Sequence, residues 1–193
     1  MKVRAGDLAL ARGIVAADRI WVVGSPGSGK SQLARRVSAL TGHPVVHLDR
    51  YFWDEGWRRR GRADREAVAA EVAGSPRWIV DGTYLSVAPR LMPATQLLVL
   101  VDASPLLCTW RLLRRPPRRG ADRPDGSSDT LRGRLLVVGA VWRFRRTKVP
   151  RIRAAVAASG CAWRVIRPRR VPALLAGLAT CTGTDRGRPA GRA

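Results

Sequence analysis

The chain has 193 residues, of which 46% are apolar, and a formal net charge of +22 from 36 basic and 14 acidic residues. This length suggests one domain, and the apolar fraction is high enough for a packed core, which excludes wholesale disorder. The charge favours binding of polyanions, whether nucleotides, nucleic acids or acidic membrane surfaces, without choosing among them.

The predicted elements alternate between short apolar runs and helical patterns. Strands are expected at 20–23, 44–48, 78–80, 96–101 and 162–166. Helices are expected at 30–40, 64–73 with Asp64 as its cap, 104–115, 131–144, 150–158 and 172–180, with a plain loop joining the third and fourth strands. Residues 1–18 are interpreted as an N-terminal extension, 19–182 as the domain and 183–193 as a disordered tail.

This order predicts an α/β fold with a doubly wound parallel sheet, because short apolar strands are typical of a sheet covered on both faces. Ligands of such folds bind at the carboxyl ends of the strands. Gly24, Asp49, Asp81 and Asp102 all follow predicted strands and are therefore expected at that edge.

Histidines, cysteines and membrane signals are uninformative about function. His43 and His47 have no acidic or cysteine partner at metal-ligand spacing, so we interpret them as strand-end residues. The cysteines form no CxxC pair and are expected to be reduced thiols. No run reaches the ~18 apolar residues of a membrane helix, and the N-terminus does not resemble a signal peptide, so we expect a cytoplasmic protein without a membrane partner.

One segment matches the phosphate-binding pattern GxxxxGK[ST] in full. Its residues are Gly24, Ser25, Pro26, Gly27, Ser28, Gly29, Lys30 and Ser31. Glycines allow backbone N–H groups to wrap a phosphate, and the helix that follows directs its positive end toward that phosphate. Lys30 is expected to reach the β and γ phosphates and Ser31 to bind magnesium, so the motif predicts binding of ATP with Mg²⁺.

Acidic residues at the other strand ends are the candidates for further chemistry. Magnesium in a P-loop site usually has a carboxylate nearby, and we favour Asp81 over Asp102 because Gly82 lets the chain turn away sharply. Asp49 is expected on the acceptor side, where it could orient or deprotonate an attacking hydroxyl. Trp53, which follows it, could stack on a planar acceptor or pack beneath the loop.

Between Arg111 and Arg170 the sequence has eighteen basic residues and three acidic ones. Arg111 and Arg115 share a helix face and lead into a Pro- and Gly-rich loop that contains Arg119 and Arg123. The run could form a lid over the triphosphate, bind a nucleic-acid backbone or be a solvated basic face. We favour the lid for 111–123 and a solvated or weakly polyanion-binding face for 132–170.

Together these motifs resemble the P-loop proteins called DNA topology modulation proteins, which are relatives of adenylate kinase. The resemblance spans roughly residues 20–167. Beyond the P-loop it rests on His47-Leu48-Asp49 with Phe52-Trp53 and Gly56-Trp57, on Trp78-Ile79-Val80-Asp81-Gly82-Thr83-Tyr84, on Arg90, and on the segments 111–115, 120–125 and 142–150.

The resemblance implies a nucleoside-monophosphate-kinase-like core with sheet order 2-3-1-4-5 and an arginine lid at about 114–126. It implies that Asp81 helps to hold magnesium through water. From the lid interpretation we expect Arg111, Arg115 and Arg119 to assist catalysis and Arg123 to contact the nucleotide. The resemblance also implies an acceptor-side segment at about 50–75, and Arg90 resembles the acceptor-binding arginine of adenylate kinases, although it is farther from Gly82 than its counterpart there. We expect Asp49, Trp53, Tyr84 and Arg90 on the acceptor side.

Two functions remain open from the sequence. The first is a kinase that transfers the γ-phosphoryl group of ATP to a small nucleotide- or nucleoside-like acceptor. The alternative is a nucleotide-binding regulator that acts on DNA or another polyanion without phosphoryl transfer.

Overall fold

The computed structural model describes residues 3–53, 58–114 and 131–185. Its five strands form one sheet in the order β2-β3-β1-β4-β5, and every neighbouring pair is parallel. The strands are β1 (Arg19–Gly24), β2 (Val45–His47), β3 (Trp78–Asp81), β4 (Leu97–Val101) and β5 (Ala162–Ile166). The predicted fold class and strand order are therefore confirmed.

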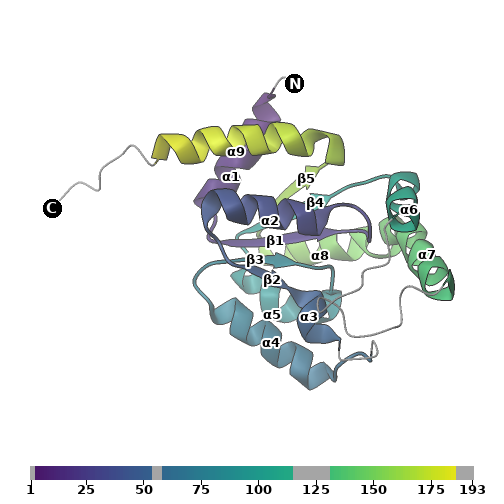
Figure 1. Ribbon diagram of the computed structural model, residues 1–193. Helices are drawn as coiled ribbons and strands as arrows, with labels where there is room; N and C mark the ends of the chain where they lie inside the picture. Colours follow the sequence, from purple (N-terminus) through teal and green to yellow (C-terminus); the bar gives the residue numbers. More distant parts are fainter. Residues whose placement is uncertain (1–2, 54–57, 115–130, 186–193) are drawn as a thin grey trace.

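Helices cover both faces of the sheet (Figure 1). They are α1 (Ala5–Ala16), α2 (Lys30–Thr41), α3 (Leu48–Phe52), α4 (Arg62–Gly74), α5 (Ala88–Leu91), α6 (Pro105–Leu113), α7 (Leu131–Thr147), α8 (Val149–Ser159) and α9 (Val171–Asp185). Three short 3₁₀ turns, η2 (Leu85–Val87), η3 (Met92–Ala94) and η4 (Pro168–Arg170), complete the described elements. None of the described helices is both long and apolar enough to cross a membrane.

The alternation of side chains along each strand divides the core into two layers. In β1, Ile20 and Val22 pack toward α1, α2 and α9, whereas Trp21 and Val23 pack toward the opposite face with α3, α4, α5 and α8. Strand β4 alternates in the same way. Because both faces are buried, all five residues of β4 are apolar, which is the pattern that predicted a parallel sheet.

Helix α1, within the segment interpreted as an extension, packs against α9 (Figure 1). Its buried residues Leu10, Ala11 and Ile14 belong to the same core layer as Leu174 and Leu178 of α9. This helix therefore shares the hydrophobic core of the sheet.

Several details of the predicted elements were wrong. The strand expected at 44–48 ends at His47, Leu48 begins the unpredicted helix α3, and α9 continues to Asp185, beyond the predicted end at 180. Helix α4 begins at Arg62 with Gly61 as its N-cap, so Asp64 lies in the first turn instead of capping it. The connection between β3 and β4, expected to be a plain loop, forms η2, α5 and η3 in succession. Proline is tolerated only near the start of a helix. Pro89 lies near the start of α5 and Pro93 near the start of η3, so neither proline can be in the interior of one longer helix, and the pieces stay short.

Candidate active site at the carboxyl ends of the strands

Residues 24–31 form the phosphate loop, which runs from the end of β1 into the start of α2, and the segment after the neighbouring strand β3 holds it in place. Thr83 Oγ1 accepts a hydrogen bond from Gly24 N and donates one to Gly24 O, both at 2.9 Å. Ser28 N closes a turn by donating to Ser25 O at 3.1 Å. The loop is thus fixed at its start before any ligand binds.

At Gly27 the loop lies against the backbone of α6. Its φ is +77°, and a Cβ built on it would lie 2.7 Å from the carbonyl oxygen of Cys108. Arg111, one turn further along α6, donates to the carbonyl oxygens of Gly27 at 3.3 Å and Ser28 at 3.2 Å. Only glycine fits both the backbone conformation and the space at position 27.

Helix α2 begins at Lys30 without a capping side chain, because its N-cap is Gly29 with φ +95°. The first N–H groups of a helix have no partner within the helix, and at such an end they form an anion-binding site. The buried hydroxyl groups of Ser25 and Ser28 also lack a hydrogen-bond partner within the described part of the chain. These unused donors fit a bound phosphate group.

Asp81 ends β3 beside this loop and is only 4% exposed. Its Oδ2 lies 2.8 Å from His47 Nδ1, whereas its buried Oδ1 has no hydrogen-bond partner among the described residues. Burial alone would raise the pKa of Asp81, but the His47 hydrogen bond, the Lys30 charge and the Ser31 hydroxyl outweigh it and lower that pKa. The carboxylate is therefore charged at neutral pH and has one oxygen available.

Asp102, the rival candidate at the end of β4, is already engaged. Arg145 of α7 donates from Nη2 to both carboxylate oxygens, at 2.8 and 3.0 Å. The two strand-end carboxylates thus differ in surroundings: Asp81 faces Lys30, and Asp102 is paired with an arginine.

On the opposite side of the loop, α3 and the segment after β3 bring three predicted acceptor residues together. Tyr84 donates its hydroxyl proton to Asp49 Oδ1 and accepts a hydrogen bond from Trp53 Nε1 at 2.8 Å. Burial and the Asp49 charge raise the pKa of Tyr84 well above its ordinary value, so its hydroxyl remains a donor. The carboxylate of Asp49 is exposed, and no described residue donates a hydrogen bond to its Oδ2.

Arg90, the fourth predicted acceptor residue, is separate from this group. It is exposed on α5, and its charge acts on Glu66 of α4. Arg65 is the arginine that braces the acceptor side, since it donates to Ser86 Oγ at 3.1 Å and lies over the Phe52 ring at 5.9 Å.

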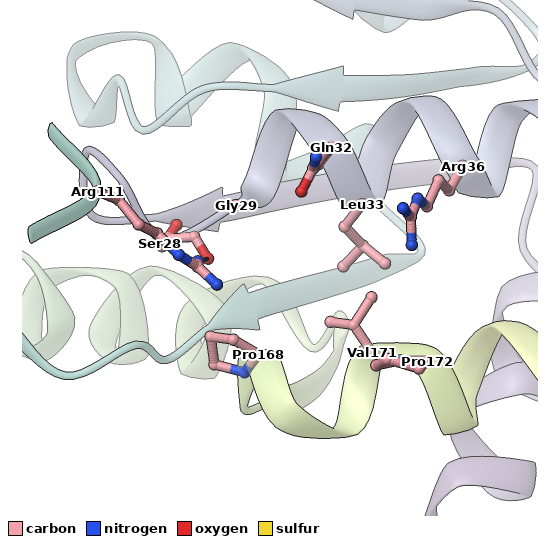
Figure 2. Close-up of a pocket in the computed structure, with 9 residues that line it drawn as sticks. All are labelled: Ser28, Gly29, Gln32, Leu33, Arg36, Arg111, Pro168, Val171 and Pro172. Carbon is pink, nitrogen blue, oxygen red and sulfur yellow. Dashed lines mark hydrogen bonds between the residues drawn. The ribbon is translucent and has the colours of Figure 1, made fainter. Parts of the chain in front are cut away.

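A shallow pocket of about 170 Å³ adjoins the loop, between α2 and the start of α9 (Figure 2). Arg111 and Ser28 lie at one end of it, and Pro168 lies across from them. Gln32, Leu33 and Arg36 of α2 face Val171 and Pro172 along its length.

Some predicted residues lie outside the described part of the chain. They are Arg115, Arg119 and Arg123, together with nearly all of the predicted lid at 114–126. Arg114 is described, and its guanidinium lies 4.7 Å from the centre of the Trp110 ring.

The sequence assigned no role to Arg145 or to the backbone of Cys108, and none to His47 or Thr83 although both belong to the motifs quoted above. His47 was interpreted as a strand-end residue, and it does end β2. Its acidic partner was not predicted, because register places it opposite Asp81 in the neighbouring strand, 34 residues away in the sequence. His47 ends its strand, and the neighbouring strand ends in Asp81. Two parallel strands that end side by side in a histidine and an aspartate are the signal that could have revealed the pair.

A five-stranded parallel sheet in this order, with a glycine-rich loop after β1, defines the fold of the P-loop kinases. Solved structures agree. Similar folds occur in shikimate kinase from Acinetobacter baumannii in complex with shikimate (TM-score 0.58, 13% identity, 92% of this chain and 99% of that one). They also occur in shikimate kinase from Bacteroides thetaiotaomicron (TM-score 0.55, 14% identity, 87% and 99%) and in a sugar kinase from a Janibacter species (TM-score 0.51, 15% identity, 84% and 92%).

No protein-family model matches the sequence, and no curated protein matches it. At these identities the similarity establishes the fold. The resemblance to DNA topology modulation proteins and to adenylate kinase stays a prediction.

Proposed function

We propose that this protein is an ATP- and magnesium-dependent phosphotransferase that acts on a small molecule bearing a hydroxyl group. One observation supports this most strongly. At the strand ends, Lys30 and Ser31 act on the buried carboxylate of Asp81, and the exposed carboxylate of Asp49 follows the adjacent strand.

The nucleotide would bind with its phosphates at the start of α2, where Gly24–Ser31 supplies N–H groups and Lys30 a positive charge. Its base would occupy the pocket in Figure 2, between the planar guanidinium of Arg111 and the ring of Pro168. Arginine planes stack well on aromatic bases, which supports this orientation.

Ser31 and Asp81 fit a magnesium site, because hydroxyl and carboxylate oxygens are the ligands that Mg²⁺ prefers. Asp81 is charged, and its Oδ1 is buried without a partner in the described chain, so it is available to water bound to the ion. When bound, magnesium would neutralise charge on the phosphates. His47 holds the other oxygen of Asp81.

Asp49 is the group we assign to the acceptor. Tyr84 occupies its Oδ1, so Oδ2 can accept the proton of an acceptor hydroxyl. The acceptor oxygen then forms a bond to the γ-phosphorus, the bond from that phosphorus to the bridging oxygen breaks, and ADP leaves with the electron pair. Trp53 would contact the rest of the acceptor. Arg115 and Arg119 would stabilise charge on the transferred group, with Arg123 at the nucleotide.

A second function is a nucleotide-binding regulator that contacts DNA or another polyanion without phosphoryl transfer. The net charge of +22 favours it, because a single kinase site needs only a few of the 36 basic residues. Such a protein would not need the open carboxylate of Asp49.

The deciding experiment incubates the protein with γ-labelled ATP, magnesium and a panel of nucleosides, nucleotides and hydroxyl-bearing small molecules. Transfer of label to one of them, abolished by Lys30→Ala and by Asp49→Asn, would support the kinase. Binding of ATP without transfer to any acceptor, combined with DNA binding, would support the regulator instead.

A further inference from the structure

A second pocket, of about 330 Å³, lies away from the phosphate loop, between the start of α1, β5 and η4. Five arginines and one aspartate contribute to its lining. The arginines are Arg4, Arg164, Arg167, Arg169 and Arg170. Positive charge is thus concentrated in a concave site that the proposed kinase reaction does not use.

The aspartate, Asp7, does not neutralise this group. Its Oδ1 accepts a hydrogen bond from Arg170 Nε at 3.2 Å, and its Oδ2 accepts from Arg4 N at 2.9 Å and from Arg170 Nη2. These bonds satisfy the carboxylate and tie η4 to α1. The carboxylate of Asp7 is therefore paired with Arg170 and leaves the other arginines of the pocket without its charge.

The remaining guanidinium groups are available to a ligand. Arg164, Arg167 and Arg169 are exposed, and none of them forms an ion pair with a described carboxylate. Among the described residues, Arg164 donates a side-chain hydrogen bond to its neighbour's carbonyl oxygen, from Nη1 to Trp163 O at 2.8 Å, and to no carboxylate. Like charges gathered around one hollow repel one another unless an anion lies between them.

The shape and the apolar part of the lining indicate the kind of anion. Leu10, Val165 and Ile166 also line the pocket, and Val165 is 47% exposed although it is an apolar strand residue. The volume lies at the lower end of the range for small-molecule pockets. Arginine forks match phosphate oxygens, and the apolar lining suits a short organic skeleton.

We propose that this pocket binds a small phosphorylated organic molecule through Arg164, Arg167 and Arg169. The inference does not depend on the proposed kinase activity, because no residue of the Gly24–Ser31 loop contributes to the pocket.

The test uses the full chain with Lys30→Ala, which removes the phosphate loop as a competing site, and titrates it calorimetrically with pyrophosphate and with glycerol 3-phosphate. We expect one saturable binding site. The double substitution Arg167→Gln/Arg169→Gln removes two charge-assisted hydrogen-bond donors and should weaken the affinity at least about tenfold. The matched control is Arg151→Gln/Arg153→Gln, which removes the same charge from exposed positions of α8 and should change the affinity less than about twofold.

Val165→Asp provides a second variant that leaves every arginine in place and adds a carboxylate to the lining. It should abolish binding while circular dichroism shows an unchanged fold. Equal weakening by the α8 control would overturn the proposal, and so would unchanged binding in Val165→Asp or no saturable binding at all. The proposal would also be overturned if the protein bound neither small phosphate but bound single-stranded DNA in a way that depends on Arg167 and Arg169. That result would indicate a nucleic-acid site.

Discussion

His47 Nδ1 lies 2.8 Å from Asp81 Oδ2, because the parallel register of β2 and β3 places the two residues directly opposite each other. The contact fixes the rotation of a buried carboxylate beside Lys30 and Ser31. It leaves the other carboxylate oxygen toward the site where we place magnesium.

Replacing His47 should separate the effect of magnesium from the binding of ATP itself. His47→Leu leaves Asp81 Oδ2 buried without a donor, which should cost about 1–3 kcal/mol of unfolding free energy. We expect the gain in ATP affinity on adding magnesium to shrink, while affinity without magnesium is unchanged. His47→Asn, whose amide can donate from a similar position, should restore most of that gain, and calorimetric titrations with and without magnesium measure it. Equal behaviour of the two variants would argue against a positioning role.

Gly27→Ala should abolish ATP binding in a folded protein, because its Cβ would lie 2.7 Å from Cys108 O and force the loop away from α6. Gly42→Ala is the matched control, since Gly42 has a similar φ of +76° but no atom near the added methyl. Both variants should lose about 1–2 kcal/mol in urea unfolding from the left-handed backbone alone. Loss of ATP binding in both would show that global stability, not loop geometry, is responsible.

Asp81→Asn should reduce magnesium-dependent turnover far more than ATP binding, because the amide keeps the shape of the side chain but removes its charge. Asp102→Asn should leave turnover intact and cost at most about 1 kcal/mol of unfolding free energy, as expected for a partly exposed ion pair with Arg145. Steady-state rates across a magnesium series test both. If Asp102→Asn were inactive while Asp81→Asn remained active, the magnesium carboxylate would be Asp102 at the end of β4 instead of Asp81.

Tyr84→Phe should raise the acceptor KM more than the KM for ATP, because Asp49 loses the donor that orients it. The Trp53 indole N–H also loses its acceptor, so unfolding free energy should fall by about 1 kcal/mol. Because the pKa of Tyr84 is raised, its hydroxyl stays protonated from pH 7 to about pH 9, and we expect the effect of Tyr84→Phe on the acceptor KM to be constant over this range. A variant with equal shifts in both KM values would contradict a specific acceptor role.

Asp7→Asn tests the pair that joins α1 to η4. Burial would raise the pKa of Asp7, but the bonds from Arg4 and Arg170 outweigh it and lower that pKa. A lowered pKa means that the stabilisation is complete above the unfolded value of about 4 and disappears as pH falls through the folded value. The variant should therefore be less stable than wild type by about 1–3 kcal/mol at pH 7 and nearly equal to it near pH 2, as measured by urea unfolding. A constant difference across this range would exclude a charged pair.

The sequence predicted features set by local pattern. Each parallel strand is a short apolar run, and the phosphate loop combines its glycines, Lys30 and Ser31 in one continuous segment. The extent of α2 was also readable, because the helix predicted at 30–40 ends at Thr41, with Gly42 in a left-handed conformation as its C-cap. These signals lie within a few residues of one another.

Features that depend on how distant segments meet could not be predicted. The contact of Gly27 with Cys108 joins residues far apart in the sequence, and the His47–Asp81 pair depends on strand register. Helix α1 has no strong amphipathic pattern, so only its packing against α9 reveals it as part of the core. Asp64 is a good capping residue by type, yet the chain enters α4 at Gly61.

Turn η4 forms a wall common to two hollows of the molecule: Pro168 lines the pocket beside the phosphate loop, while Arg167 and Arg169 on either side of it line the arginine pocket. Three successive residues cannot shift independently. If a ligand in one hollow displaces the turn, thermodynamic linkage requires that ligands in the two hollows alter each other's affinity by the same factor. The Asp7–Arg170 pair, which anchors this turn to α1, then sets how freely it moves and how large that factor can become.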